Sequence, residues 1–338
     1  MPTTRTARYA TLLAATCALA ALTLTGCSGS GGKGSEEKPA QTGGEGGRAA
    51  DTPRMKIAMI THSGEGDTFW DIVQSGAKAA AAKDNVEFLY SANKEGKEQA
   101  QLVEAAIDQK VQGIVVTLAK PEAVGAAVKK AVAAGIPVVT INSGGRHSKA
   151  LGALSHIGQD EAVAGEGVGE ELTRRGRKKA LCVIHEQGNV SLEERCAGVK
   201  KAFQGSVENL NVEGTNMPAT TSSIEAKLQT AKDIDAVVTL GAPFADATVK
   251  AKAGSGSTAE VDTFDLNAAV VKSLKSQDVG FAVDQQPYLQ GYLAVDEIWL
   301  NRTNGNVLGG GKPVLTGPAI VTAKDVPALE KYTARGTR

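Results

Sequence analysis

The chain is poor in aromatic side chains and carries no excess charge of either sign. Only 4% of its 338 residues are aromatic, and 37 basic residues balance 37 acidic ones. A chain without a broad basic field has no general attraction for nucleic acid or anionic lipid, so binding must come from a local site. We therefore expect no nucleic-acid partner. The scarcity of rings also makes the adjacent pair Phe69-Trp70 conspicuous.

The body of the chain also lacks the short motifs that commonly identify enzymes. It has no Gly-x-Ser-x-Gly elbow, no Gly-x-x-x-x-Gly-Lys phosphate loop and no His/Cys cluster at metal-ligand spacing. Gly165, Gly167 and Gly169 lie inside a helical stretch without the spacing of a nucleotide loop, which favours close helix packing. We therefore expect a protein that is not an enzyme and that uses no cofactor and no metal.

The first 26 residues have the features of a targeting segment. Two arginines precede an apolar run over 9–24, which is shorter than the about 20 apolar residues of a comfortable membrane span. The run leads into Leu24-Thr25-Gly26-Cys27, which resembles the lipobox of bacterial lipoproteins. The resemblance implies a signal peptide over 1–26, a lipid on Cys27, and an extracytoplasmic protein held on the outer face of the cell membrane. The alternative is an ordinary signal peptide with a chance cysteine.

The segment after this cysteine has the composition of a tether. Residues 28–53 are rich in Gly, Ser, Lys and Glu and contain almost nothing that a core can bury. Such a segment does not gain enough from burial to offset its conformational entropy. We therefore assign 27–53 to the lipidated cysteine and a flexible tether.

Two cysteines remain for the body of the protein. Cys182 lies in an apolar, strand-like run and Cys196 on the helix that follows it. A strand and a helix of one βα unit are packed neighbours, and thiols outside the cytoplasm can be oxidised. The pair is either a disulfide or two buried free thiols.

From Met55 onward, short apolar runs alternate with helical stretches of about a dozen residues. This alternation is typical of βαβ units and of parallel sheets covered on both faces. One series ends near Ile141, a second begins near Leu154, and 318–322 is a last extended piece. The strands are too many for one comfortable sheet, so we expect an α/β fold with two doubly wound parallel-sheet lobes. Ligands of such sheets bind beyond the carboxyl ends of the strands.

Several landmarks then follow one another in a recognisable order. They are Gly66-Asp67-Thr68-Phe69-Trp70, the run Gly135-Ile136-Pro137-Val138-Val139-Thr140-Ile141-Asn142, His156-Ile157-Gly158-Gln159-Asp160, Arg195, Asp265 and Gln285-Gln286-Pro287. From about Lys56 to Ala323, the sequence resembles the ribose-type (type I) periplasmic sugar-binding proteins. The resemblance implies a Venus-flytrap clamp of two lobes joined by three crossovers, near Ile157, Gln285 and Leu315.

This resemblance also implies a division of the body and a function. The N-terminal lobe would comprise 54–157 plus 286–315, and the C-terminal lobe 158–285 plus 316–338. A monomer would capture a monosaccharide or related polyol between the lobes and deliver it to the transmembrane subunits and ATPase of an ABC permease. The alternative is the same fold with another cargo, such as an autoinducer-type furanone, inositol or a nucleoside, or a ligand-binding subunit of a chemoreceptor or sensor.

The resemblance carries over seven ligand-binding residues, whose types suit a sugar. Aromatic rings stack on C–H faces, and Asp, Asn, Gln and Arg bond hydroxyl groups. The seven are Asp67, Phe69, Trp70, Asn142, Arg195, Asp265 and Gln285. Each has a plainer interpretation: a helix cap for the aspartates, core for one of the two rings, a turn for Asn142, a hinge for Gln285, and a surface pair with Glu193 or Glu194 for Arg195.

The sequence departs from the family pattern at two places. Asn142-Ser143 stands where an Asp-Arg pair is common, and Gly241 stands where an Asn is usual. The site is therefore not a standard ribose site. His62 and the pair His185-Glu186 are candidates for the replacement polar groups, and we include His62 among the ligand-binding residues. The alternative for His62 is a solvated or structural loop residue.

Overall fold

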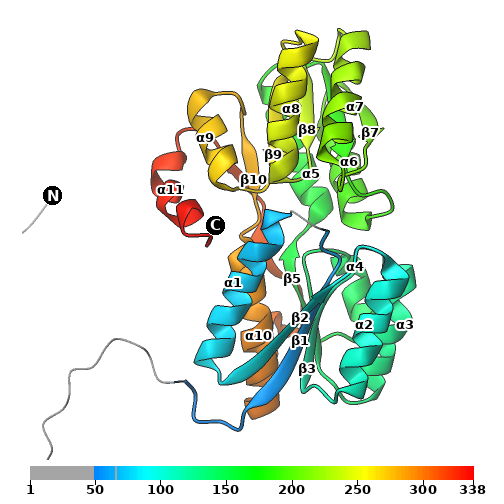
Figure 1. Cartoon of the computed structure of the whole chain (residues 1–338), viewed down its shortest axis with the longest axis vertical. Helices are drawn as coiled ribbons and strands as arrows, with labels where there is room; N and C mark the ends of the chain where they lie inside the picture. Colours follow the sequence, from blue (N-terminus) through cyan, green and yellow to red (C-terminus); the bar gives the residue numbers. More distant parts are fainter. Residues whose placement is uncertain (1–48, 65–66) are drawn as a thin grey trace, which may run out of the picture. The chain divides into compact units, whose positions relative to one another are not determined.

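The structure is a computed structural model that describes residues 49–64 and 67–338 (Figure 1). The predicted signal peptide over 1–26, Cys27 and most of the predicted tether lie outside the described residues. Among the helices within them, none is both long enough and apolar enough to cross a membrane.

The first of two sheets lies in the lower half of Figure 1. Its strands in the described chain are β1 (Met55–Thr61), β2 (Val86–Ala92), β3 (Gly113–Thr117), β4 (Val138–Ile141), β5 (Ser155–Gln159) and β11 (Val314–Gly317). They lie in the order β11-β5-β4-β3-β1-β2, and all neighbours are parallel. The helices around it are α1 (Thr68–Lys83), α2 (Gly96–Asp108), α3 (Pro121–Ala133), the short α4 (Gly145–Ser148) with the 3-10 turn η1 (Lys149–Leu151), and α10 (Pro287–Asn304), which a second 3-10 turn, η2 (Leu308–Gly311), follows.

Both faces of this sheet are buried, which explains its continuous apolar strands. Ile57 and Met59 of β1 pack into one core with α1 and α10, whereas Ala58 and Ile60 pack into another with α2 and α3. Successive side chains of a strand point to opposite faces, so every position of β1 in these two cores is apolar when helices cover both sides.

The second sheet repeats this arrangement. Its strands in the described residues are β6 (Lys179–Ile184), β7 (Ser206–Asn211), β8 (Ala236–Thr239), β9 (Glu260–Phe264), β10 (Ala282–Asp284) and β12 (Ala319–Val321). Their order is β12-β10-β9-β8-β6-β7. The helices around it are α5 (Glu161–Arg174), α6 (Val190–Ala202), α7 (Met217–Thr230), α8 (Ala242–Ser255), α9 (Ala268–Ser276) and α11 (Val326–Ala334).

The expected fold of two doubly wound lobes with three crossovers is therefore confirmed. The chain passes between the sheets after β5, after β10 and after β11. One detail differs, because the edge strand β12 runs antiparallel to β10. The extended piece at 318–322 follows β11 directly and enters the second sheet without a crossover helix. Parallel neighbours in a sheet are usually joined by such a helix. The residue boundaries of the lobes stay a prediction.

Glycines allow pairs of helices to approach each other closely. A Cβ on Gly165 of α5 would lie 2.1 Å from the carbonyl oxygen of Arg195 in α6, and one on Gly169 would lie 2.7 Å from that of Val199. A Cβ on Gly167 would meet nothing within 4 Å. Two of the three glycines noted in the sequence thus serve close packing of α5 against α6, as expected.

The two cysteines of the body lie on β6 and on α6. The structure joins Cys182 of β6 to Cys196 of α6 in a disulfide, with their Cα atoms 5.9 Å apart. Both residues are buried in the core between the second sheet and the helices α5 and α6. The bridge therefore fixes α6, which carries Arg195, to a strand in the interior of its sheet.

Candidate functional site

A cavity of about 510 Å³ lies at the carboxyl ends of the strands of both sheets. Its lining comes from the segments that follow β1, β2, β3, β4, β6, β7, β8, β9 and β10. This volume lies in the range of small-molecule sites, about 300–1,000 Å³. All eight predicted ligand-binding residues line this one cavity: His62, Asp67, Phe69, Trp70, Asn142, Arg195, Asp265 and Gln285. Their contact with a ligand stays a prediction.

The rings of Phe69 and Trp70 form one wall. Asp67 caps α1 by accepting a hydrogen bond from the backbone N–H of Phe69 at 3.1 Å, which starts the helix at the cavity. The two rings meet edge to face with centroids 5.0 Å apart, and both are also part of the core beneath α1. Both rings therefore line the cavity and also belong to the core, and which of them contacts a ligand stays a prediction.

A row of polar side chains crosses from one sheet to the other. Asn142 donates from Nδ2 to Oε1 of Gln285 at 3.2 Å, and Gln285 donates from Nε2 to Oδ1 of Asp265 at 2.7 Å. Asn142 and Asp265 both have left-handed backbones, with φ of 58° and 69°. Asp265 does not cap the next helix, because Asn267 does so by accepting from the N–H of Val270.

Arg195 is buried on α6, and only 3% of its surface is exposed. It pairs with Glu161 of α5 rather than with Glu193 or Glu194 on its own helix. Its Nε lies 2.6 Å from Oε2 of Glu161, and its Nη2 lies 3.0 Å from Oε1. Nη1 donates to the carbonyl of Leu240 at 3.1 Å. These contacts fix the plane of the guanidinium at the cavity wall.

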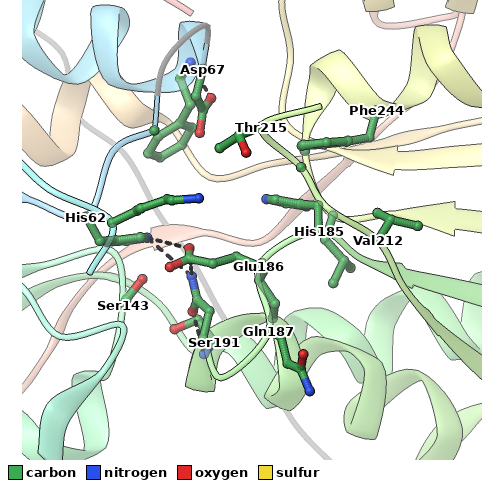
Figure 2. A pocket seen from close by; sticks show the side chains of 18 of the residues that line it. His62, Asp67, Ser143, His185, Glu186, Gln187, Ser191, Val212, Thr215 and Phe244 are labelled. Carbon is green, nitrogen blue, oxygen red and sulfur yellow. Dashed lines mark hydrogen bonds and ion pairs between the residues drawn. The ribbon is translucent and has the colours of Figure 1, made fainter. Parts of the chain in front are cut away.

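A second aromatic surface faces the cavity from the other sheet. The ring of His185 stacks on that of Phe244, with centroids 3.9 Å apart and planes 15° apart. Figure 2 shows this pair on the side of the pocket opposite His62. Burial, and then the positive charge of Arg195, lower the pKa of His185 to about 3. Its imidazole is therefore neutral and presents a flat surface for stacking.

His62 is not a solvated loop residue, because it is buried and bonded on both ring nitrogens. Nδ1 lies 2.8 Å from Oγ1 of Thr117. Nε2 lies 3.3 Å from Nδ2 of Asn189, which follows β6 of the second sheet and caps α6. Oε2 of Glu186 lies 3.8 Å from Nε2 of His62 (Figure 2). Oε1 of the same carboxylate lies 3.3 Å from Nζ of Lys120. These contacts close one side of the cavity.

The two aspartates of the site hold protons more tightly than usual. Burial raises the pKa of Asp67 to about 6 and that of Asp265 to about 7. Near neutral pH each is poised between a carboxylate that accepts hydrogen bonds and an acid that also donates one. Such groups suit hydroxyl ligands, which both donate and accept.

Sequence reasoning missed several residues of the site. Phe244 follows Gly241 closely and is one of few aromatic residues, so its rarity was an available signal. Glu161 gave no signal, because an acidic residue in the first turn of a helix is ordinary. Within the described residues, no group of three or more His, Cys, Asp or Glu side chains is arranged to hold a metal ion.

Two α/β lobes around a cavity at the carboxyl ends of their strands define a protein of the solute-binding class. The chain belongs to the periplasmic binding protein domain family, whose model matches residues 57–301. Members of this family are binding components of transport rather than enzymes.

Individual relatives agree with this class. The chain is 48% identical to a carbohydrate transporter from Acidothermus cellulolyticus 11B solved in complex with myo-inositol. The match covers 85% of this chain and 100% of that one, with a TM-score of 0.84. It is 26% identical to the xylose/arabinose-binding protein XylF of Sulfolobus acidocaldarius, over 78% of this chain and 70% of the relative. It is 25% identical to the ribose import binding protein RbsB of Bacillus subtilis, over 68% of this chain and 75% of the relative.

Proposed function

We propose that this protein captures a monosaccharide or a cyclic polyol in the cavity and delivers it to an ABC permease, without catalysing a reaction. The observation that carries the proposal is the combination of rings and hydrogen-bonding groups around one cavity. The Phe69-Trp70 pair and the His185-Phe244 pair offer faces for C–H surfaces, and the row from Asn142 to Asp265 offers groups for hydroxyls.

A site of this kind selects ligands by their hydroxyl groups. Gln285 and Asp265 are buried, so an analogue that lacks a hydroxyl leaves a polar group without its partner. The relative that was solved with myo-inositol is 48% identical to this chain, and it supports a cyclic polyol of the inositol type, which was named above as an alternative cargo. The relatives named for xylose, arabinose and ribose support a pentose.

We further propose that the protein is a monomer held at the outer face of the cell membrane by a lipid on Cys27. The contacts of Thr52 support the predicted end of the tether. Its hydroxyl accepts from Nε1 of Trp299 at 3.1 Å, and its carbonyl accepts from Nδ2 of Asn85 at 2.8 Å. The backbone N–H of Ala50 also donates to the carbonyl of Lys83 at 2.7 Å, so the folded body holds the chain from about Ala50 onward, a few residues before the predicted end of the tether at residue 53.

A thermal-shift screen of the purified protein tests the proposed cargo. Pentoses, hexoses, cyclic polyols including myo-inositol, nucleosides and furanones are compared. A ligand that binds only the folded state adds about 2.7 kcal/mol of stability at a hundredfold excess over Kd. A rise in Tm with a monosaccharide or polyol supports the proposal, whereas a rise with a nucleoside or furanone alone would replace the cargo and retain the class.

A further inference from the structure

Glu161 lies behind the cavity wall and does not line the cavity itself. It is the first residue of α5 and is 4% exposed. Its carboxylate accepts two hydrogen bonds from Arg195, and a third from Nε2 of Gln159 at 2.8 Å. The close packing of α5 on α6 at Gly165 brings the two residues together. Glu161 is thus a buried counter-ion for the guanidinium of the site.

This pairing decides how Arg195 meets a ligand. Three of its five N–H groups are engaged, two by Glu161 and one by the carbonyl of Leu240, and the rest are left for the cavity. The ring of Phe264 lies against the guanidinium at 4.6 Å and restricts it further. The guanidinium therefore acts as a fixed donor to oxygen atoms at one position on the wall.

The charges around the guanidinium leave no net positive field for an anion. The other ionisable groups that face it are Asp67, Asp265, His62 and His185. Two lysines also line the cavity, and each is paired with an acidic side chain: Lys120 with Glu186 at 3.3 Å and Lys94 with Glu213 at 3.5 Å. The imidazoles of both histidines are neutral at pH 7, since burial lowers the pKa of each. The positive charge of Arg195 is matched by Glu161, and the aspartates add negative charge as they ionise. An anionic ligand would lose its hydration without gaining an unpaired cation.

Resting on the proposed function, we infer that Glu161 is a positioning residue that determines specificity. It holds Arg195 as a hydroxyl donor and cancels its charge, so that the cavity binds uncharged polyols and rejects their carboxylated or phosphorylated counterparts. Glu161 touches no ligand and acts through Arg195 alone.

The test compares the full chain with the variant Glu161→Gln, which removes the charge and keeps the shape. Isothermal titration calorimetry measures the affinities for myo-inositol and D-glucose, and for their anionic counterparts myo-inositol 1-phosphate and D-glucuronate. In the wild type, the neutral probes bind and the anionic ones bind far more weakly. Two charges about 8 Å apart at an effective dielectric of about 20 repel enough to change affinity about thirtyfold. We expect Glu161→Gln to raise the anionic-to-neutral affinity ratio by about this factor.

Glu166→Gln is the matched control, because it removes a carboxylate from the same helix where Glu166 pairs only with the exposed Lys201. It should leave the ratio unchanged. A parallel loss of both affinities in Glu161→Gln would overturn the inference, since a merely structural role predicts that result. If this variant does not fold, the affinities of the wild type test the inference alone. Equal affinities for D-glucose and D-glucuronate, or for myo-inositol and its phosphate, would overturn the inference. A wild type that binds neither of these neutral probes nor any monosaccharide or polyol of the thermal-shift screen would instead refute the proposed function, and the inference with it.

Discussion

The packing of α5 against α6 leads to a prediction that two nearby glycines test against each other. In Gly165→Ala, the new Cβ would lie 2.1 Å from the carbonyl oxygen of Arg195, whereas an ordinary contact begins near 3.4 Å. The helices must therefore separate by about 1 Å, because a backbone carbonyl cannot rotate away like a side chain. In Gly167→Ala, the Cβ meets nothing within 4 Å.

These geometries predict opposite signs. Alanine is favoured over glycine inside a helix by about 1 kcal/mol, so Gly167→Ala should raise the free energy of unfolding by about that amount. Gly165→Ala gains the same propensity but suffers overpacking and loss of helix contact, which typically cost about 1–3 kcal/mol and more where the backbone must move. We expect a net loss of about 2 kcal/mol. The displaced backbone belongs to Arg195, so ligand affinity should also fall by about tenfold or more.

Urea denaturation followed by circular dichroism gives the two free energies, and calorimetry with the ligand found in the screen gives the affinities. Gly167→Ala is the control, because it makes the same glycine-to-alanine change in the same helix without the steric contact. If Gly165→Ala were as stable as Gly167→Ala and bound ligand equally well, the two helices would not pack as described, and the account of how Arg195 is placed would be refuted.

Further predictions concern the disulfide, the buried acid and the closing contacts. Replacing Cys182 and Cys196 together by alanine should lower the free energy of unfolding by about 3 kcal/mol, given their separation of 14 residues; an unchanged urea midpoint would contradict the bridge. Burial raises the pKa of Asp265 from 3.8 to about 7, so the protonated side chain is favoured in the ligand-free fold. Its contribution to the free energy of unfolding is therefore fully present below about pH 4 and is lost as the pH rises through about 7. Asp265→Asn should therefore gain stability relative to the wild type between pH 5 and pH 8, and an equal difference at both would argue against the burial. Glu186→Ala removes the partner of Lys120 across the cavity and should speed ligand release about tenfold in stopped-flow fluorescence, whereas an unchanged rate would show that this pair does not retain the ligand.

The fold was largely predictable because its pattern is repetitive and local. Runs such as Gly113–Thr117 are buried at every position, and the structure shows why, since helices cover both faces of each sheet. The direction of β12 was not predictable. It depends on how the chain returns from β11, and no local preference distinguishes a parallel from an antiparallel edge strand.

The location of the site was predictable to a similar degree. Strand ends in a parallel sheet meet at one edge, so polar residues such as Asn142 and Asp265 could be assigned to one place from the sequence alone. The partner of Arg195 could not. Glu161 is 34 residues away, and only the packing of two helices brings the charges together. The role of His62 could not be decided from the sequence for the same reason, because its partners Thr117, at the end of β3, and Asn189, at the start of α6, are distant in the sequence.

The proposed capture of a polyol in the cavity beside Trp70 can be tested directly, because the chain contains two tryptophans. Trp70 lines the cavity, whereas Trp299 lies on α10 and bonds Thr52, outside the lining. Intrinsic fluorescence is titrated with myo-inositol and monosaccharides in the wild type, Trp70→Phe and Trp299→Phe. We predict a saturable change in the wild type and in Trp299→Phe that is absent from Trp70→Phe. No change with any polyol, or a change that persists in Trp70→Phe and vanishes in Trp299→Phe, would contradict polyol binding beside Trp70.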